Sequence, residues 1–177
     1  NLDLEYGFHY SATTDAPRYD RLTLDANGDS ILDHAEWYYG PQKWMMNNLN
    51  VTHTGNNGLY DQMAVRLARQ DFEESRIDRD INKPERHIRI EAVVANSVNL
   101  DFTKSVGNRH KLFYGAELVH NDVASTGIDE DISLGESAPG PARYPQSAWA
   151  SYGLYATDQF RISEKLTAQA GMRYNQY

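Results

Sequence analysis

The chain has 177 residues, a formal net charge of -8 and no cysteine. The lack of cysteine excludes a disulfide scaffold, thiolate metal sites and a cysteine nucleophile. An acidic balance without any basic stripe argues against nucleic acid as a partner.

Apolar and polar residues alternate along most of the chain, which predicts β-strands with one apolar face. The longest clean apolar run, Ala92-Val93-Val94-Ala95, is far below the roughly 18 residues of a membrane-spanning helix. The alternation is clearest over residues 88–103, a strand of about 15 residues, whereas globular strands usually have about 5 to 6. No convincing helix is predicted. Seven strands are predicted, over residues 2–10, 45–51, 60–68, 88–103, 111–118, 150–161 and 166–175.

The links between these strands alternate in length. The short links carry turn-forming residues such as Gly55 and Gly107. Outer-membrane barrels have short periplasmic turns and long extracellular loops, whereas a soluble β-sandwich has no reason to alternate them. The sequence therefore favours an all-β fold, an antiparallel transmembrane β-barrel segment. The six links are residues 11–42, 54–59, 73–86, 105–110, 122–148 and 163–165.

Aromatic residues cluster near the ends of the predicted strands, which resembles the aromatic girdles at the two membrane interfaces. The opposite faces of the strands carry charges that a wet barrel lumen tolerates and lipid does not. The expected girdle residues are Tyr10, Tyr38, Tyr39, Trp44, Trp149 and Tyr174 at the outer ends, and Phe102 and Phe160 at the periplasmic ends. The expected lumen charges include Arg66, Arg89, Glu91, Glu117 and Arg173.

Several stretches point to one family. Residues 17–23 and the run Trp37-Tyr38-Tyr39-Gly40-Pro41-Gln42 resemble the first long outer loop and strand entry of Bacteroidetes-type TonB-dependent receptors. Residues 110–117 and the hairpin 152–174 are similar to strands of the same receptors. The resemblance implies a barrel of about 22 strands with a plugged lumen. On this reading residues 1–177 are part of one β-barrel domain, and the plug domain and remaining strands belong to a longer protein.

The resemblance also implies a function and a location. We expect a receptor of the bacterial outer membrane that takes up a scarce nutrient of the iron-siderophore, haem, vitamin or glycan class, and no enzyme and no cofactor. Its expected partners are outer-membrane lipid, the TonB complex acting through the plug segment, a small-molecule or glycan ligand, and a surface lipoprotein. Two alternatives stay open: a soluble all-β binding or adhesion module, and a passive porin-like outer-membrane barrel.

Ligand contacts are expected in the outer loops, around residues 18–42, 73–86 and 122–146. The sequence contains no phosphate-cradling glycine loop and no nucleophile–base spacing, so no catalytic residue is predicted. The six histidines form no ligand pair on one element, and no metal site is assigned. The candidate ligand-binding residues are Arg18, Tyr19, Arg21, Trp37, Tyr38, Tyr39, Arg76 and Arg79.

One segment of the first long loop has two interpretations. Asp25, Asn27, Asp29, Asp33 and Glu36 fall at positions 1, 3, 5, 9 and 12 of an EF-hand-like calcium loop. Position 6, where such a loop has glycine, is Ser30, and no helices flank the segment. The favoured interpretation is a β-hairpin turned by Asn27-Gly28, in which Leu22 and Leu24 pair with Ile31 and Leu32. Calcium binding stays open at this point.

Overall fold

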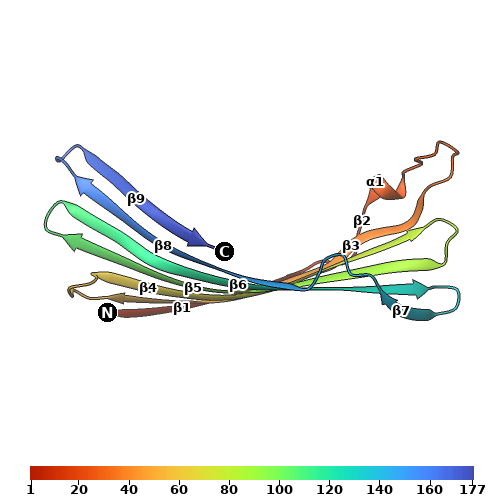
Figure 1. The fold of residues 1–177 in the computed structure, drawn as a ribbon, viewed down its shortest axis with the longest axis horizontal. Coiled ribbons are helices and arrows are strands. Elements are labelled where there is room, and N and C mark those ends of the chain that lie inside the picture. Colours follow the sequence, from red (N-terminus) through yellow and green to blue (C-terminus); the bar gives the residue numbers. More distant parts are fainter.

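Seven long strands form an open antiparallel sheet in the computed structural model, which describes residues 1–177 (Figure 1). Each strand is hydrogen-bonded to the next long strand along the chain, so the predicted seven-strand meander is confirmed. The first and last strands are the unpaired edges, and the sheet is not closed. The strands are β1 (Leu2–Ala12), β3 (His34–Thr54), β4 (Gln62–Asp80), β5 (Glu85–Val106), β6 (His110–Asp131), β8 (Ser147–Arg161) and β9 (Thr167–Gln176).

Three short elements lie at one end of the sheet, the right-hand end in Figure 1. β2 (Ala16–Pro17) pairs with β3, and β7 (Glu136–Gly140) pairs with β6. The third is α1 (Tyr19–Leu22), a single turn of four residues. This turn was not predicted, because four residues are too few to show a helical period. No helix in the structure has the length and apolar character needed to span a membrane.

The cross-strand register sorts the side chains onto two faces, because residues paired in a sheet point to the same side. One row joins six strands on the apolar face: Val51, Val65, Leu100, Ala116, Leu154 and Tyr174. The adjacent row on the polar face is Asn50, Arg66, Asn99, Glu117, Gly153 and Asn175.

No hydrophobic residue of the sheet is buried. Leu154 and Tyr174 on the apolar face remain 58% exposed. A sheet in water would cover such a face with a second layer, whereas lipid can cover it in a barrel. This apolar belt lies in the half of the sheet next to the short turns. It ends at a polar row formed by Asn47, Arg69, Asn96 and His120.

Four strands continue well beyond the belt. We call this part the outer extension and define it as residues 34–42 of β3, 74–80 of β4, 85–91 of β5 and 125–131 of β6. β5 alone has 22 residues, whereas a tilted membrane strand needs about 9 to 11. Both faces carry charges in the outer extension, so hydrophobic alternation fades there although the backbone stays extended.

The extension corrects the predicted links. The second long link, residues 73–86, is wrong: β4 and β5 are joined by residues 81–84 alone. The predicted second strand is also too short, since β3 begins at His34 and includes the Trp-Tyr-Tyr-Gly-Pro-Gln run. The first and third outer links, residues 13–33 and 132–146, are long as expected.

The predicted hairpin at Asn27-Gly28 is wrong as well. No strand pairing occurs between residues 22 and 32. Instead the Asp25 carboxylate accepts backbone N–H bonds from Gly28, Asp29 and Ser30, at 2.7, 3.2 and 2.8 Å. Aspartate competes with strand pairing in this way because its short side chain reaches the backbone just ahead of it.

The predicted girdles hold for some of the rings. The register places Tyr10, Phe102, Phe160 and Tyr174 on the apolar face, as expected. It places Trp44, Trp149 and Tyr39 on the polar face, where they cannot belong to a lipid-facing girdle. Tyr38 lies opposite Ile77, on the face of the outer extension that continues the apolar belt.

Candidate functional site

The polar face of the outer extension gathers arginine and aromatic side chains from three elements. Trp37 and Tyr39 of β3 share this face with Arg76 of β4, which lies directly opposite Tyr39. The Arg76 guanidinium lies over the Trp37 ring, 4.8 Å from its centroid. Arg21, from α1, lies over the same ring at 5.4 Å. Guanidinium groups favour such positions because the ring face carries negative charge.

The chain segment before β3 is folded back so that it reaches this face. β2 pairs with the first part of β3, setting Ala16 opposite Tyr39. Arg18 then lies over the Tyr39 ring at 5.1 Å and donates a 2.9 Å hydrogen bond to its hydroxyl. Arg18 also forms a forked pair with Asp20, at 2.7 and 2.5 Å. This pair raises the pKa of Arg18 and lowers the pKa of Asp20.

On the opposite face an ion-pair row crosses four strands. Glu36 accepts hydrogen bonds from Arg79 at 3.1 Å and from Arg86 at 2.7 Å. Arg86 continues to Glu130 at 3.0 Å. The bond from Arg86, joined by that from Arg79, holds the pKa of Glu36 below its usual range although burial opposes the shift.

The structure therefore divides the candidate residues. Arg18, Arg21, Trp37, Tyr39 and Arg76 come together on the polar face. Tyr38 and Arg79 lie on the other face, where Arg79 binds Glu36. Tyr19 in α1 is 71% exposed. We call the five residues that come together the Trp37 cluster.

A second polar group, which the sequence did not reveal, fixes the long link after β6. Glu91 and Ser125 are 8% and 7% exposed and lie opposite each other. The Ser125 hydroxyl accepts the backbone N–H of Arg143 at 3.1 Å, and the Arg143 guanidinium reaches Glu91 at 3.4 Å. Residues of this link show no periodicity that would have placed them against β5 and β6.

Next to this group, the Asp129 carboxylate pairs with two side chains: His87 Nδ1 and Arg89 Nη2 each lie 2.8 Å from its Oδ1 atom. The hydrogen bond from His87 and the nearby Arg89 lower the pKa of Asp129. All three side chains lie on the polar face, level with the Trp37 cluster. The polar face of the outer extension is thus ordered across four strands.

Nearer the short turns, charges on the polar face also pair across strands. Arg66 contacts Asp101 at 2.5 Å, and Arg173 contacts Glu117 at 2.7 Å. Tyr155 donates to Asp101. The expectation that these charges share one face is confirmed.

The calcium spacing does not correspond to a ligand cluster. No group of three or more histidine, aspartate or glutamate side chains is close enough together to hold a metal ion. The carboxylate of Asp25 accepts backbone amides, and that of Glu36 is bound by two arginines.

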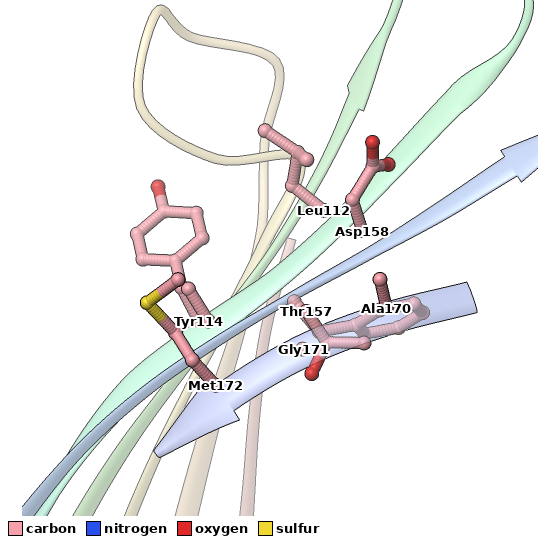
Figure 2. A pocket seen from close by; sticks show the side chains of 9 residues that line it. Leu112, Tyr114, Thr157, Asp158, Ala170, Gly171 and Met172 are labelled. Atoms are coloured by element: carbon pink, nitrogen blue, oxygen red, sulfur yellow. The ribbon is translucent and has the colours of Figure 1, made fainter. Parts of the chain in front are cut away.

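The apolar face carries a shallow hollow of about 390 Å³ between β6, β8 and β9 (Figure 2). Figure 2 shows Tyr114 and Met172 close together at one side of it, with Leu112 and Asp158 projecting farther along. Asp158 is paired with His110 at 2.7 Å. The hollow has apolar walls and contains no nucleophile with a base beside it, so it fits a lipid-covered surface better than a catalytic pocket.

Comparison with known proteins agrees with this arrangement. A family model described as "TonB dependent receptor-like, beta-barrel" matches residues 1–177. No curated protein matches the chain. Among solved structures, the chain is similar to "Copper transporter OprC" with a TM-score of 0.58 and 10% sequence identity. That match covers 78% of this chain and 23% of the other, and at such low identity it shows the fold alone.

Proposed function

The chain belongs to the TonB-dependent receptor β-barrel family, whose members are outer-membrane proteins, and from this we propose that it forms part of the wall of an active nutrient transporter. The match of the family model over residues 1–177 carries the proposal. The exposed apolar belt supports it, because this belt suits lipid on the outside of a barrel wall. The polar face would then line the lumen.

The rest of the transporter is part of the same proposal. The chain spans 23% of the length of the solved structure that it resembles. We assign to the remainder of the receptor the other strands and a plug that engages the TonB complex. The proton gradient of the inner membrane, transmitted through TonB, would then release the captured nutrient inward.

The capture surface that we assign is the polar face of the outer extension. It lies beyond the apolar belt, and the Trp37 cluster presents aromatic rings and guanidinium groups there. Such groups stack on and hydrogen-bond to organic nutrients. The solved neighbour is named a copper transporter; for the present receptor we keep the siderophore, haem, vitamin and glycan classes as candidates.

The test is TonB-dependent uptake by the intact receptor in cells. A panel of labelled ferric siderophores, haem, cobalamin and oligosaccharides would be offered to wild-type cells, to cells lacking the receptor and to cells lacking TonB. We expect one class to accumulate in wild-type cells alone. Accumulation that needs the receptor but not TonB would instead indicate a passive, porin-like barrel.

A further inference from the structure

We propose that the Trp37 cluster is a binding site for an oxyanion, the carboxylate or phosphate group of a small ligand. The first observation concerns two N–H donors, Trp37 Nε1 and Arg76 Nε. Both atoms are shielded from solvent and neither has a hydrogen-bond acceptor. A buried donor without an acceptor is unfavourable, so two such donors on residues that pack against each other call for an explanation.

The chemistry of these groups selects an acceptor. Indole and guanidinium groups donate hydrogen bonds and accept none. The nearest carboxylate, Asp78, lies with Oδ1 3.7 Å from Arg76 Nε, which is too far for a hydrogen bond. One oxyanion held at the edge of the Trp37 ring could accept from both donors.

The arginines at the ring point to the same class of ligand. Arg18 is already engaged by Asp20 in a forked pair. The other two guanidinium groups, those of Arg21 and Arg76, have no hydrogen-bonded carboxylate, because their closest carboxylate oxygens lie at 3.9 Å on Asp20 and 3.7 Å on Asp78. Both can therefore bind an acceptor, and hydrogen bonds between two charged groups favour an oxyanion over a neutral sugar.

The guanidinium group of Arg21 is a third donor beside those of Trp37 and Arg76. Its side chain is 45% exposed and forms no hydrogen bond, and its nearest carboxylate oxygen, on Asp20, is 3.9 Å away. It covers the Trp37 ring from α1, a single helical turn. From this position its free N–H groups can reach an oxyanion held at the ring and serve as a third donor.

This inference names the ligand class of the proposed capture surface and rests on that function, yet its test is independent of transport. The purified intact receptor is titrated with inorganic phosphate, with chloride replacing phosphate at constant ionic strength, and the heat of binding is recorded by isothermal titration calorimetry. We expect a saturable heat of binding that is absent in Trp37→Phe, which keeps an aromatic ring but loses the N–H donor. Arg76→Gln should weaken binding about tenfold or more, because it removes a charged donor.

Arg69→Gln is the matched control, since Arg69 lies on the same strand but on the opposite face, paired with Asp71. It should leave phosphate binding unchanged, and circular dichroism should show that all variants are folded. A phosphate response that survives both Trp37→Phe and Arg76→Gln, or no saturable response in the wild type, overturns the proposal. Maltose giving the response in place of phosphate would reassign the site to neutral sugars. If the wild-type receptor binds phosphate but supports no TonB-dependent uptake, that result counts against the transport proposal alone.

Discussion

At the scale of single residues, the outer extension depends on which face each side chain occupies. A β-bulge between Tyr39 and Gln42 shifts the register of β3 against β4. Inside the bulge the polar face takes even-numbered residues such as Trp44, and beyond it odd-numbered ones such as Trp37. One inserted residue therefore moves the indole of Trp37 onto the wet face and Glu36 onto the other.

This bulge also limits what the sequence can predict about the site. The composition of residues 18–42 and 73–86 was sufficient to place arginines and aromatic rings at the outer end. Which of them meet could not be predicted, because alternation counted from Met45 gives Trp37 and Tyr39 the wrong face. A bulge has no fixed sequence signature when both faces are polar.

Substitution of Glu36 tests the ion-pair row on the opposite face. We predict that Glu36→Gln lowers the free energy of local opening at the outer end of β3 and β5 by roughly 1.5–3 kcal/mol, because Arg79 and Arg86 lose a charged acceptor. Hydrogen exchange of the amides in residues 34–39 and 85–88 measures this. Glu73→Gln, which breaks a pair between half-exposed side chains, should have a much smaller effect.

The same row has a defined pH dependence. The pKa of Glu36 is lowered in the folded state, so its contribution is complete above the usual pKa of glutamate. It is lost as the pH falls through the lowered folded-state value. Wild-type protection should therefore decline in acid and converge on that of Glu36→Gln. An equal difference between the two proteins at every pH would contradict the assignment.

At the scale of elements, the strands are longer than their hydrophobic alternation. The positions and order of all seven strands could be predicted, because lipid on one side and water on the other impose a period of two. Where water lies on both sides, that constraint disappears, and cross-strand ion pairs such as Lys43–Glu73 take over. The outer ends of β3, β4, β5 and β6 were misjudged for this reason.

Ser75 holds the bulge that joins the two parts of β3. Its hydroxyl is buried and donates to the Gly40 carbonyl at 2.5 Å. We predict that Ser75→Ala costs about 1 kcal/mol and increases hydrogen exchange in residues 38–44. Ser97→Ala, in a β5 serine whose hydroxyl has no hydrogen-bond partner in the structure, serves as the control. Equal effects of both substitutions would show that Ser75 has no special role in the bulge.

At the scale of the whole molecule, the sheet has two parts: an apolar belt suited to contact with lipid, and the outer extension, which is charged on both faces and suited to water. The turns 55–61, 107–109 and 162–166 lie at one end of the sheet, and α1, β2, β7 and the short turn 81–84 lie at the other (Figure 1). Loop lengths predicted this polarity through the first and third links, residues 13–33 and 132–146, whereas the predicted second long link is the short turn 81–84. The length of the outer extension could not be predicted, because it depends on how many residues beyond the belt pair in strands and how many form loops.

Because the chain has no cysteine, single cysteines report the orientation of the sheet directly. In the intact receptor, with cysteines elsewhere removed, we predict that Leu134→Cys reacts with a membrane-impermeant maleimide on whole cells and Asn108→Cys does not. Leu134 is 69% exposed beyond β6, and Asn108 lies in a short turn. Permeabilised cells should label at both positions. Labelling of Asn108→Cys alone in whole cells would reverse the orientation.

The unbroken strands of the outer extension have a thermodynamic consequence for capture. Ordering one backbone residue costs about 1–2 kcal/mol, and a mobile outer loop would incur that cost each time a ligand bound. Here the residues that carry Trp37, Tyr39 and Arg76 are already ordered by the sheet ladder when the protein folds. Binding then has to restrain little more than the side chain of Arg21. The proposed capture surface would therefore hold a dilute ligand with few contacts, since almost none of their free energy is spent on arranging the backbone.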